Sequence, residues 1–308
     1  MKRQKPSNLS SSVHQRLLNL RDESNQGFNL LLTRYALERL LYRISKSEYA
    51  NQFILKGALL FVVWKWGSYR PTQDMDLLGY GGSSFESVKD LFQKICHVDV
   101  EPDGLQFDSE SITVQEIREN QEYESQRIHM VANLGNARIK LQIDMGFGDV
   151  ITPSAQVIDY PVLLDFPKPH IRVYPPETVI AEKLQAMVIL GMQNSRMKDY
   201  YDLWQLAQHF TFEGNTLTAA ISATFSHRQT DIPTDFPVGL TDVFAEDVQK
   251  TTQWQAFLSR ISVDNRTKFK EVVDDLRAFL GPPLFAARKN ESLQKSWNDG
   301  GPWIMHKV

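Results

Sequence analysis

Two aspartates separated by one residue, Asp74 and Asp76, have the spacing in this sequence that most directly suggests chemistry. On a β-strand, residues two apart point to the same side, so both carboxylates would project together while Met75 and Leu77 face the core. Neighbouring carboxylates repel each other, and a fold that holds them together usually has a cation between them. Mg²⁺ prefers one or two carboxylates plus substrate phosphates, which a nucleoside triphosphate would supply. Such pairs are also common on solvated loops, so the pair alone leaves both interpretations open.

The tripeptide Lys56-Gly57-Ala58 lies upstream of this pair. A glycine at the start of a helix lets backbone N–H groups approach a phosphate closely. We therefore predict that these three residues bind the phosphates of a nucleotide. An ordinary tight turn is the alternative.

A third carboxylate, Asp144, ends the alternating stretch that runs from Ile139 to Ile143. A strand that buries Ile139, Leu141 and Ile143 would expose Asp144 on its other face. In a two-metal site, such a carboxylate would bind one ion and orient the attacking hydroxyl, as a base or as a metal partner. A turn residue at the end of a strand is the alternative.

Lys183 lies on a helix that Pro175-Pro176 introduces, close to the apolar face of that helix. Such a lysine could neutralise the charge that develops on a triphosphate, whereas the alternative is a surface lysine that extends into solvent. Asp199 and Asp202 are three apart on the next helix and share a face. Asp199 could hold the Lys183 ammonium or contact the base or ribose, and Asp202 could bind nucleotide or only cap the helix or pair with a nearby cation.

The elements that must position these residues follow from hydrophobic periodicity. The spacing predicts helices over residues 26–45, 85–96, 177–190 and 196–210, and a helix or strand–helix piece over 53–66. It predicts strands over 75–78, 111–117, 128–134 and 137–145, the last two joined into a hairpin by Gly135-Asn136. The segment 151–174 is expected to run over the sheet edge. The fold class is therefore α+β, with a small mixed sheet followed by a helical second half. We expect a disordered N-terminus over residues 1–12, a catalytic core over 13–174 and a helical C-terminal domain over 175–308.

The composition narrows the class of protein. The chain has 308 residues and a formal net charge of −3, so the whole molecule is not a general polyanion binder. A single cysteine excludes an internal disulfide and a thiolate zinc site. The N-terminal stretch lacks the apolar core of a signal peptide, and no stretch is long and apolar enough to span a membrane. These features predict a cytoplasmic protein without a membrane partner.

Four motifs occur in an order that resembles the AbiEii/AbiGii-type toxin family of nucleotidyltransferases. They are Phe53–Leu60, Arg70–Leu77, Ala181–Ala186 and Arg196–Leu203. The resemblance implies a DNA-polymerase-β-like nucleotidyltransferase core with a helical C-terminal domain. It also implies the toxin of a toxin–antitoxin or abortive-infection pair, with a separately encoded antitoxin as partner. Some members of the family transfer nucleotides to the 3′ end of tRNA.

The resemblance also implies roles for individual residues. By matching position, Asp74 and Asp76 are the metal-binding pair, with Arg70 and Thr72 just before them. The remaining matches are the first-motif glycine Gly57, the helix lysine Lys183 and the last-motif aspartate Asp199. Ala58 departs from the pattern, because the superfamily usually has glycine or serine there. A hydroxyl contact to phosphate is then missing, while a backbone N–H contact survives.

The sequence thus predicts a nucleotidyltransferase that uses Mg²⁺, with Mn²⁺ as the alternative ion, and a nucleoside triphosphate as substrate. The expected acceptor is RNA, with tRNA favoured by the resemblance alone. Nucleotidylation of a protein hydroxyl and a kinase-like transfer to a partner are the rival reactions, since the same aspartates would serve. A non-catalytic nucleotide-binding or antitoxin-binding module is the rival from another class.

Overall fold

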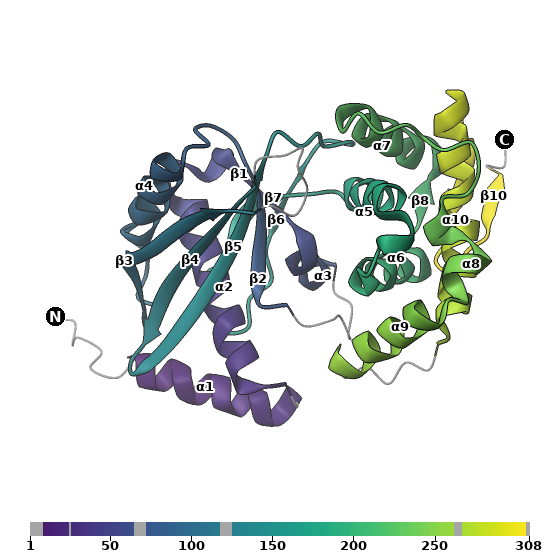
Figure 1. The fold of residues 1–308 in the computed structure, drawn as a ribbon. Coiled ribbons are helices and arrows are strands. Elements are labelled where there is room, and N and C mark those ends of the chain that lie inside the picture. Colours follow the sequence, from purple (N-terminus) through teal and green to yellow (C-terminus); the bar gives the residue numbers. More distant parts are fainter. Residues whose placement is uncertain (1–8, 25, 65–71, 118–124, 262–266, 306–308) are drawn as a thin grey trace, which may run out of the picture. The chain divides into compact units, whose positions relative to one another are not determined.

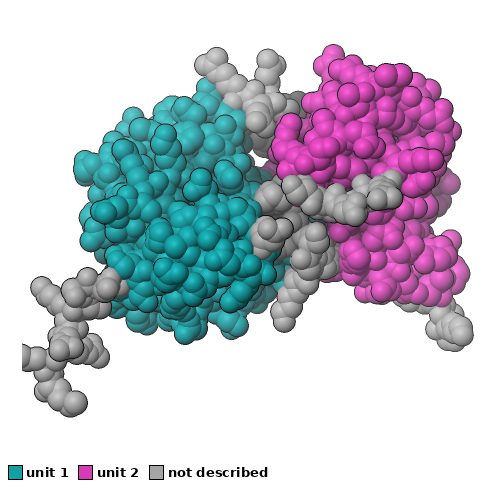
Figure 2. Space-filling view, turned by 90° about the horizontal axis from the view of Figure 1, so that it is seen from below, with its two compact units in different colours: residues 1–148, 156–173 teal, residues 149–155, 174–308 magenta. Residues whose placement is uncertain are grey.

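The computed structural model describes residues 9–24, 26–64, 72–117, 125–261 and 267–305. The chain divides into two compact units, which Figure 2 shows in different colours. Unit 1 comprises residues 1–148 and 156–173, and unit 2 comprises residues 149–155 and 174–308. The division therefore falls beside Tyr174, and a short segment that precedes β6 in the chain belongs to unit 2.

Unit 1 is built on a mixed sheet of seven strands in the order β3-β4-β5-β2-β1-β7-β6 (Figure 1). Its strands are β1 (Phe53–Lys56), β2 (Asp74–Gly79), β3 (Leu105–Glu116), β4 (Ser125–Leu134), β5 (Ala137–Phe147), β6 (Gln156–Asp159) and β7 (His170–Val173). Two neighbouring pairs are parallel, β2 with β5 and β1 with β7, and the others are antiparallel. The expected hairpin is present, because Leu134 pairs with Ala137 across the turn.

Alternation of apolar and polar side chains explains why the central strands form. On β5, Ile139, Leu141 and Ile143 are buried, while Gln142 and Asp144 keep some exposure on the other face. Buried residues of successive strands then line up on the same face and pack together. The polar face of the central strands is left to carry functional groups.

The helices of unit 1 are α1 (Leu9–Ser24), α2 (Phe28–Lys46), α3 (Leu60–Val63) and α4 (Phe85–Cys96), with single 3-10 turns η1 (Ala50–Gln52) and η2 (Gly57–Leu59). Helix α2 packs on the sheet through β5 and β7, and α4 packs on β3 and on α2 (Figure 1). Ser84 caps α4 by accepting a hydrogen bond from the backbone N–H of Ser87 at 3.1 Å. Arg43 of α2 donates to the buried Asp103 at 2.7 Å, which fastens the helix to the chain before β3.

A buried glutamate of α2 holds the segment between β6 and β7. One carboxylate oxygen of Glu38 accepts from Arg34 at 3.1 Å, and the other accepts from the backbone N–H of Leu163 at 2.9 Å. Burial raises the pKa of Glu38 from its ordinary value of 4.5 to about 7, although Arg34 and the Leu163 N–H work in the opposite direction.

This pKa predicts a pH-dependent stability. Between pH 4.5 and 7 the folded protein keeps a proton on Glu38 that the unfolded chain has released, so the free energy of unfolding falls as the pH rises through that window. Glu38→Gln removes this titration. The wild type should therefore lose stability relative to the variant as the pH rises from 4.5 to above 7. At about 1.4 kcal/mol per pKa unit, the relative loss in unfolding free energy is up to about 3 kcal/mol.

Urea unfolding of both proteins at pH 5 and pH 8 measures the effect. Glu86→Gln, which removes an exposed carboxylate from α4, is the matched control and should follow the wild type at both pH values. An equal difference between Glu38→Gln and wild type at the two pH values would contradict the prediction.

Unit 2 is mainly helical. Its helices are α5 (Pro176–Leu190), α6 (Met197–His209), α7 (Gly214–His227), α8 (Asp242–Ala245), α9 (Val248–Ile261) and α10 (Phe269–Lys289), with 3-10 turns η3 (Gly191–Gln193) and η4 (Val238–Leu240). A three-stranded sheet, β8 (Phe212–Glu213), β9 (Lys295–Trp297) and β10 (Trp303–Met305), completes it. Pro176 opens α5 at a place where its missing N–H costs nothing. Stacked aromatic rings, such as Tyr200 on Phe244 at 5.5 Å between centroids, fill the interior.

The fold class inferred from the sequence, an α+β core with a mixed sheet and a helical second half, is confirmed. The predicted disordered N-terminus is wrong for Leu9–Ser12, which form the first turn of α1. This segment is mostly polar, so its composition does not predict a helix. Burial of Val13 and Leu17 against the rest of unit 1 stabilises it. The segment 151–174 contributes two short strands to the sheet edge: β7 pairs with β1, which is distant in sequence, and β6 pairs with β7.

Among the described residues, no helix has the length and apolar character needed to cross a membrane.

Candidate active site

The two aspartates of β2 point to the same face of the sheet. Asp74 and Asp76 alternate with Met75 and Leu77, whose side chains are buried, and both aspartates keep partial exposure. Thr72, which precedes them, lies 3.4 Å from the Asp74 backbone N–H through its hydroxyl oxygen. Arg70, the other residue expected before the pair, lies outside the described residues. The local arrangement of the aspartates is therefore the one that the alternation predicts.

Strand register brings four charged side chains into one row. Lys56 of β1 pairs with Asp76 of β2, Asp76 pairs with Asp144 of β5, and Asp144 pairs with Arg127 of β4. Directly paired residues on neighbouring strands project to the same face, with Cβ atoms about 5 Å apart. We call Lys56, Asp76, Asp144 and Arg127 the charged row. It reads cation, carboxylate, carboxylate, cation across the four strands.

Gly57 explains how Asp76 fits beside the next segment of chain. Gly57 has a φ of 71°, a conformation that disfavours other residues, and an added Cβ would lie 2.5 Å from Asp76 Cγ. The absence of a side chain therefore creates the space that the Asp76 carboxylate fills. The structure thus places Lys56 and Gly57 beside Asp76, and Ala58 follows them in η2.

The third carboxylate has a partner that the sequence reasoning did not include. Arg127 forms a two-pronged pair with Asp144, in which Nε donates to Oδ1 at 2.8 Å and Nη2 donates to Oδ2 at 2.8 Å. In the part of the chain that the structure describes, no three acidic, histidine or cysteine side chains are grouped closely enough to hold a metal ion. Asp144 thus lies next to Asp76 in register, but its carboxylate is turned to a guanidinium.

The residue types present still match the chemistry of Mg²⁺. Asp74 and Asp76 offer two carboxylates on one face, which is a donor set that Mg²⁺ uses together with substrate phosphates. The space at Gly57 admits the Asp76 carboxylate against the backbone, and a larger residue would fill it. The residue types on this face of unit 1 are therefore compatible with a divalent cation held by Asp74 and Asp76.

The second group of candidate residues is assembled within unit 2. Lys183 of α5 donates to Asp199 at 2.5 Å and to Asp202 at 3.0 Å, both on α6. Its side chain is 16% exposed, and those of the aspartates are 6% and 2% exposed. The alternative of a surface lysine extending into solvent is therefore wrong, because the ammonium lies between two buried carboxylates. Asp202 and Asp199 both accept a hydrogen bond from the Lys183 ammonium.

A buried lysine supports the chain that leads into α6. Lys250, 4% exposed, donates to the backbone carbonyl oxygen of Asn194 at 3.0 Å. The Asn194 side chain in turn accepts from the backbone N–H of Arg196 at 2.9 Å. These bonds fix the start of the helix that carries Asp199. Nothing in the periodicity around Lys250 distinguished it from a solvated lysine.

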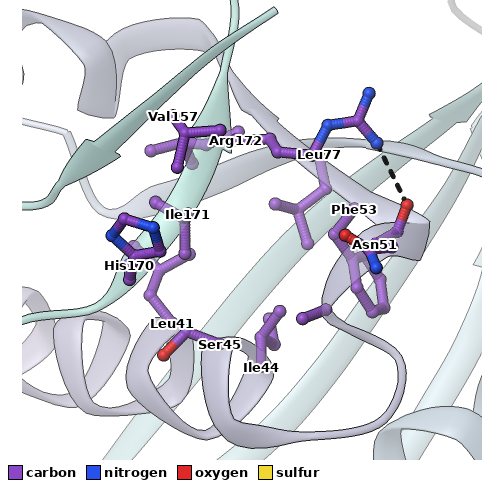
Figure 3. Close-up of a pocket in the computed structure, with 12 residues that line it drawn as sticks. Leu41, Ile44, Ser45, Asn51, Phe53, Leu77, Val157, His170, Ile171 and Arg172 are labelled. Atoms are coloured by element: carbon purple, nitrogen blue, oxygen red, sulfur yellow. Dashed lines mark hydrogen bonds between the residues drawn. The ribbon is translucent and has the colours of Figure 1, made fainter.

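Unit 1 contains a cavity of about 280 Å³ (Figure 3). Leu55 and Leu77 line it, and they alternate along their strands with Lys56 and Asp76, so they point to the opposite face. Figure 3 shows residues of α2 along one side of this cavity and residues of β7 along another. We therefore do not assign it to the nucleotide.

The family model described as "Nucleotidyl transferase AbiEii toxin, Type IV TA system" matches residues 39–279. The chain belongs to this family of toxin nucleotidyltransferases, whose toxin–antitoxin type implies an antitoxin partner.

Two solved structures show similarity at low sequence identity. JHP933 from Helicobacter pylori is 13% identical, with 84% of this chain and 92% of that chain covered and a TM-score of 0.46. A candidate nucleotidyltransferase from H. pylori is 14% identical, with 84% and 95% covered and a TM-score of 0.46. A comparison with curated proteins found no match.

Proposed function

We propose that this protein is a Mg²⁺-dependent nucleotidyltransferase that moves a nucleoside monophosphate from a nucleoside triphosphate to a hydroxyl of RNA. The tRNA 3′ end is the acceptor we favour, and Mn²⁺ is the alternative ion. The protein would act as the cytoplasmic toxin of a toxin–antitoxin pair. The proposal is supported chiefly by one observation: Asp74 and the charged row lie on the same face of the sheet, beside Gly57.

The chemistry asks the protein for positioning and charge neutralisation more than for covalent catalysis. The acceptor oxygen forms a bond to the α-phosphorus, the bond from the α-phosphorus to the bridging oxygen breaks, and pyrophosphate leaves with the electron pair. A bound Mg²⁺ would supply Lewis-acid stabilisation of the charge on the phosphates. Asp74, Asp76 and Asp144 would hold it. Asp144 would also orient the acceptor hydroxyl, as metal partner or as the base that receives its proton and passes it to water.

The remaining residues are assigned to the nucleotide. Lys56, Gly57 and Ala58, together with Thr72 and Arg70, would bind the triphosphate next to Asp76. Lys183 would neutralise the charge that develops on it, with Asp199 and Asp202 orienting the ammonium. Direct contact of Asp202 with the nucleotide stays a prediction.

Labelled nucleotides test this function. The purified protein is incubated with each α-labelled triphosphate, with either Mg²⁺ or a chelator, and with tRNA, total RNA or lysate protein in turn. We expect Mg²⁺-dependent label on RNA, and on tRNA within total RNA.

Other patterns of labelling would contradict the proposed acceptor or the proposed activity. Label on protein alone, or transfer only from γ-labelled triphosphate, would replace the RNA acceptor by one of the rival reactions. No transfer in any mixture would favour a non-catalytic binding module and contradict the proposal.

A further inference from the structure

The pair between Arg127 and Asp144 uses the whole carboxylate. Both oxygens of Asp144 accept from the guanidinium at 2.8 Å, so each already has a charged donor. Gln142 adds to the arrangement, because with its amide oxygen turned toward Arg127 it accepts from Nε at 3.1 Å and from Nη2 at 3.3 Å. That orientation gives shorter contacts than the 3.4 Å that its amide nitrogen makes with Asp144 in the other one. The guanidinium is thus held by two side chains of β5.

The order of charges in the row favours a positive charge beside Asp144. Asp144 lies in register between Asp76 and Arg127, so one neighbour is another carboxylate and the other is a guanidinium. Like charges directly opposite on neighbouring strands are destabilising, and an adjacent positive charge relieves them. A divalent cation bound by Asp76 and Asp144 would provide the same relief. The guanidinium and the cation therefore compete for one carboxylate.

Exposure makes this competition feasible. The side chains of Arg127 and Asp144 are 28% and 20% exposed, so the pair is only partly desolvated. A pair open to solvent is much weaker than a buried one, because water replaces its hydrogen bonds. An incoming cation therefore competes with a two-pronged pair that partial exposure to solvent weakens.

We propose that Arg127 competes with a divalent cation for Asp144, so that the cation must displace the guanidinium before Asp144 joins Asp74 and Asp76. This inference rests on the proposed function, since it concerns the same carboxylates. It assigns to Arg127 the control of metal affinity. The ligand concerned is a hard divalent cation that takes oxygen donors.

Binding of Mn²⁺ without nucleotide tests the proposal independently of catalysis. Free Mn²⁺ is measured by electron paramagnetic resonance in titrations of wild type, Arg127→Gln and Arg127→Lys. Removing the competitor should tighten Mn²⁺ binding by about tenfold in Arg127→Gln, which corresponds to about 1.4 kcal/mol. Arg127→Lys keeps the charge but loses the planar fork, so its affinity should fall between the two.

Two controls separate competition at Asp144 from a general effect of charge. Arg138→Gln removes the same charge from an exposed residue of β5, six positions from Asp144 and on the same face of the strand. The Mn²⁺ affinity of this variant should equal that of the wild type. In an Asp144→Asn background, adding Arg127→Gln should give no further gain, because the carboxylate in dispute is absent.

Two results would contradict the blocking role of Arg127. Equal Mn²⁺ affinity in wild type, Arg127→Lys and Arg127→Gln would overturn the blocking role of Arg127, as would a gain that persists in the Asp144→Asn background. Thermal unfolding of each variant confirms that it is folded before titration. Because no transfer is measured, a protein that proves inactive on RNA would still give the Mn²⁺ result, and a failed blocking role would leave the transfer assay unaffected.

Discussion

Asp76→Asn is expected to lower the rate of nucleotidyl transfer by about a thousandfold or more. A metal ion contributes several kcal/mol of charge stabilisation in the transition state, and each 1.36 kcal/mol is a tenfold change in rate. Asparagine keeps the shape that fits beside Gly57 but removes the charge that, in the proposed function, would hold the cation. The variant should therefore fold and fail in catalysis. Single-turnover transfer of α-labelled nucleotide measures the loss.

Thermal unfolding separates loss of the ion from loss of the fold. In the wild type, Mg²⁺ together with nucleoside triphosphate should raise the melting temperature, because a ligand that binds only the folded state stabilises it. Asp76→Asn should melt near the ligand-free wild type and show no such rise. Asp159→Asn, which changes an exposed aspartate on edge strand β6, is the control and should behave as wild type in both assays.

Growth supplies a second measurement of the same variant. Induced expression of the wild type in a bacterial host without the cognate antitoxin should arrest growth, while Asp76→Asn should not. Equal growth with both forms would contradict the assignment as a toxin but not the assignment as an enzyme. Full transfer activity in Asp76→Asn would remove the metal-site assignment itself.

Local alternation accounts for the part of the site that the sequence predicts. Strands β2 and β5 alternate strongly, so the common face of Asp74, Asp76 and Asp144 follows from residue order. The register of Arg127 was also within reach, because a two-residue turn that pairs Leu134 with Ala137 must pair Arg127 with Asp144. The pairing therefore depends only on the length of the turn, although no local pattern marks Arg127 as the partner of a candidate site residue.

Elements that depend on distant partners were not predictable in this way. Strands β6 and β7 have four residues each, and β7 is stabilised by β1, which lies more than 100 positions earlier in the sequence. Helix α1 buries only Val13 and Leu17, a stripe too narrow to stand out from its polar residues. The burial of Lys183 is similar, since helical spacing places it near an apolar face but only the packing of α6 surrounds it with carboxylates.

Lys183→Met is the second variant with a large expected effect, and it should act on both rate and stability. If the ammonium neutralises the triphosphate, transfer should fall by about a hundredfold or more. Removing it also leaves Asp199 and Asp202 close together and largely buried, without the cation between them. Breaking a buried pair by removing one partner costs about 3–5 kcal/mol. Lys183→Arg should restore the rate poorly, because a planar guanidinium does not replace a compact ammonium.

A triple variant separates the two effects. Lys183→Met combined with Asp199→Asn and Asp202→Asn removes the buried negative charges together with the lysine, so much of the lost unfolding free energy should return. Transfer should remain as low as in Lys183→Met, because the neutral cluster cannot offset the charge of a triphosphate. Urea unfolding measures the first quantity and single-turnover kinetics the second. If the triple variant recovers both stability and transfer, the lysine only neutralises its two aspartates, and its assignment to the nucleotide is wrong.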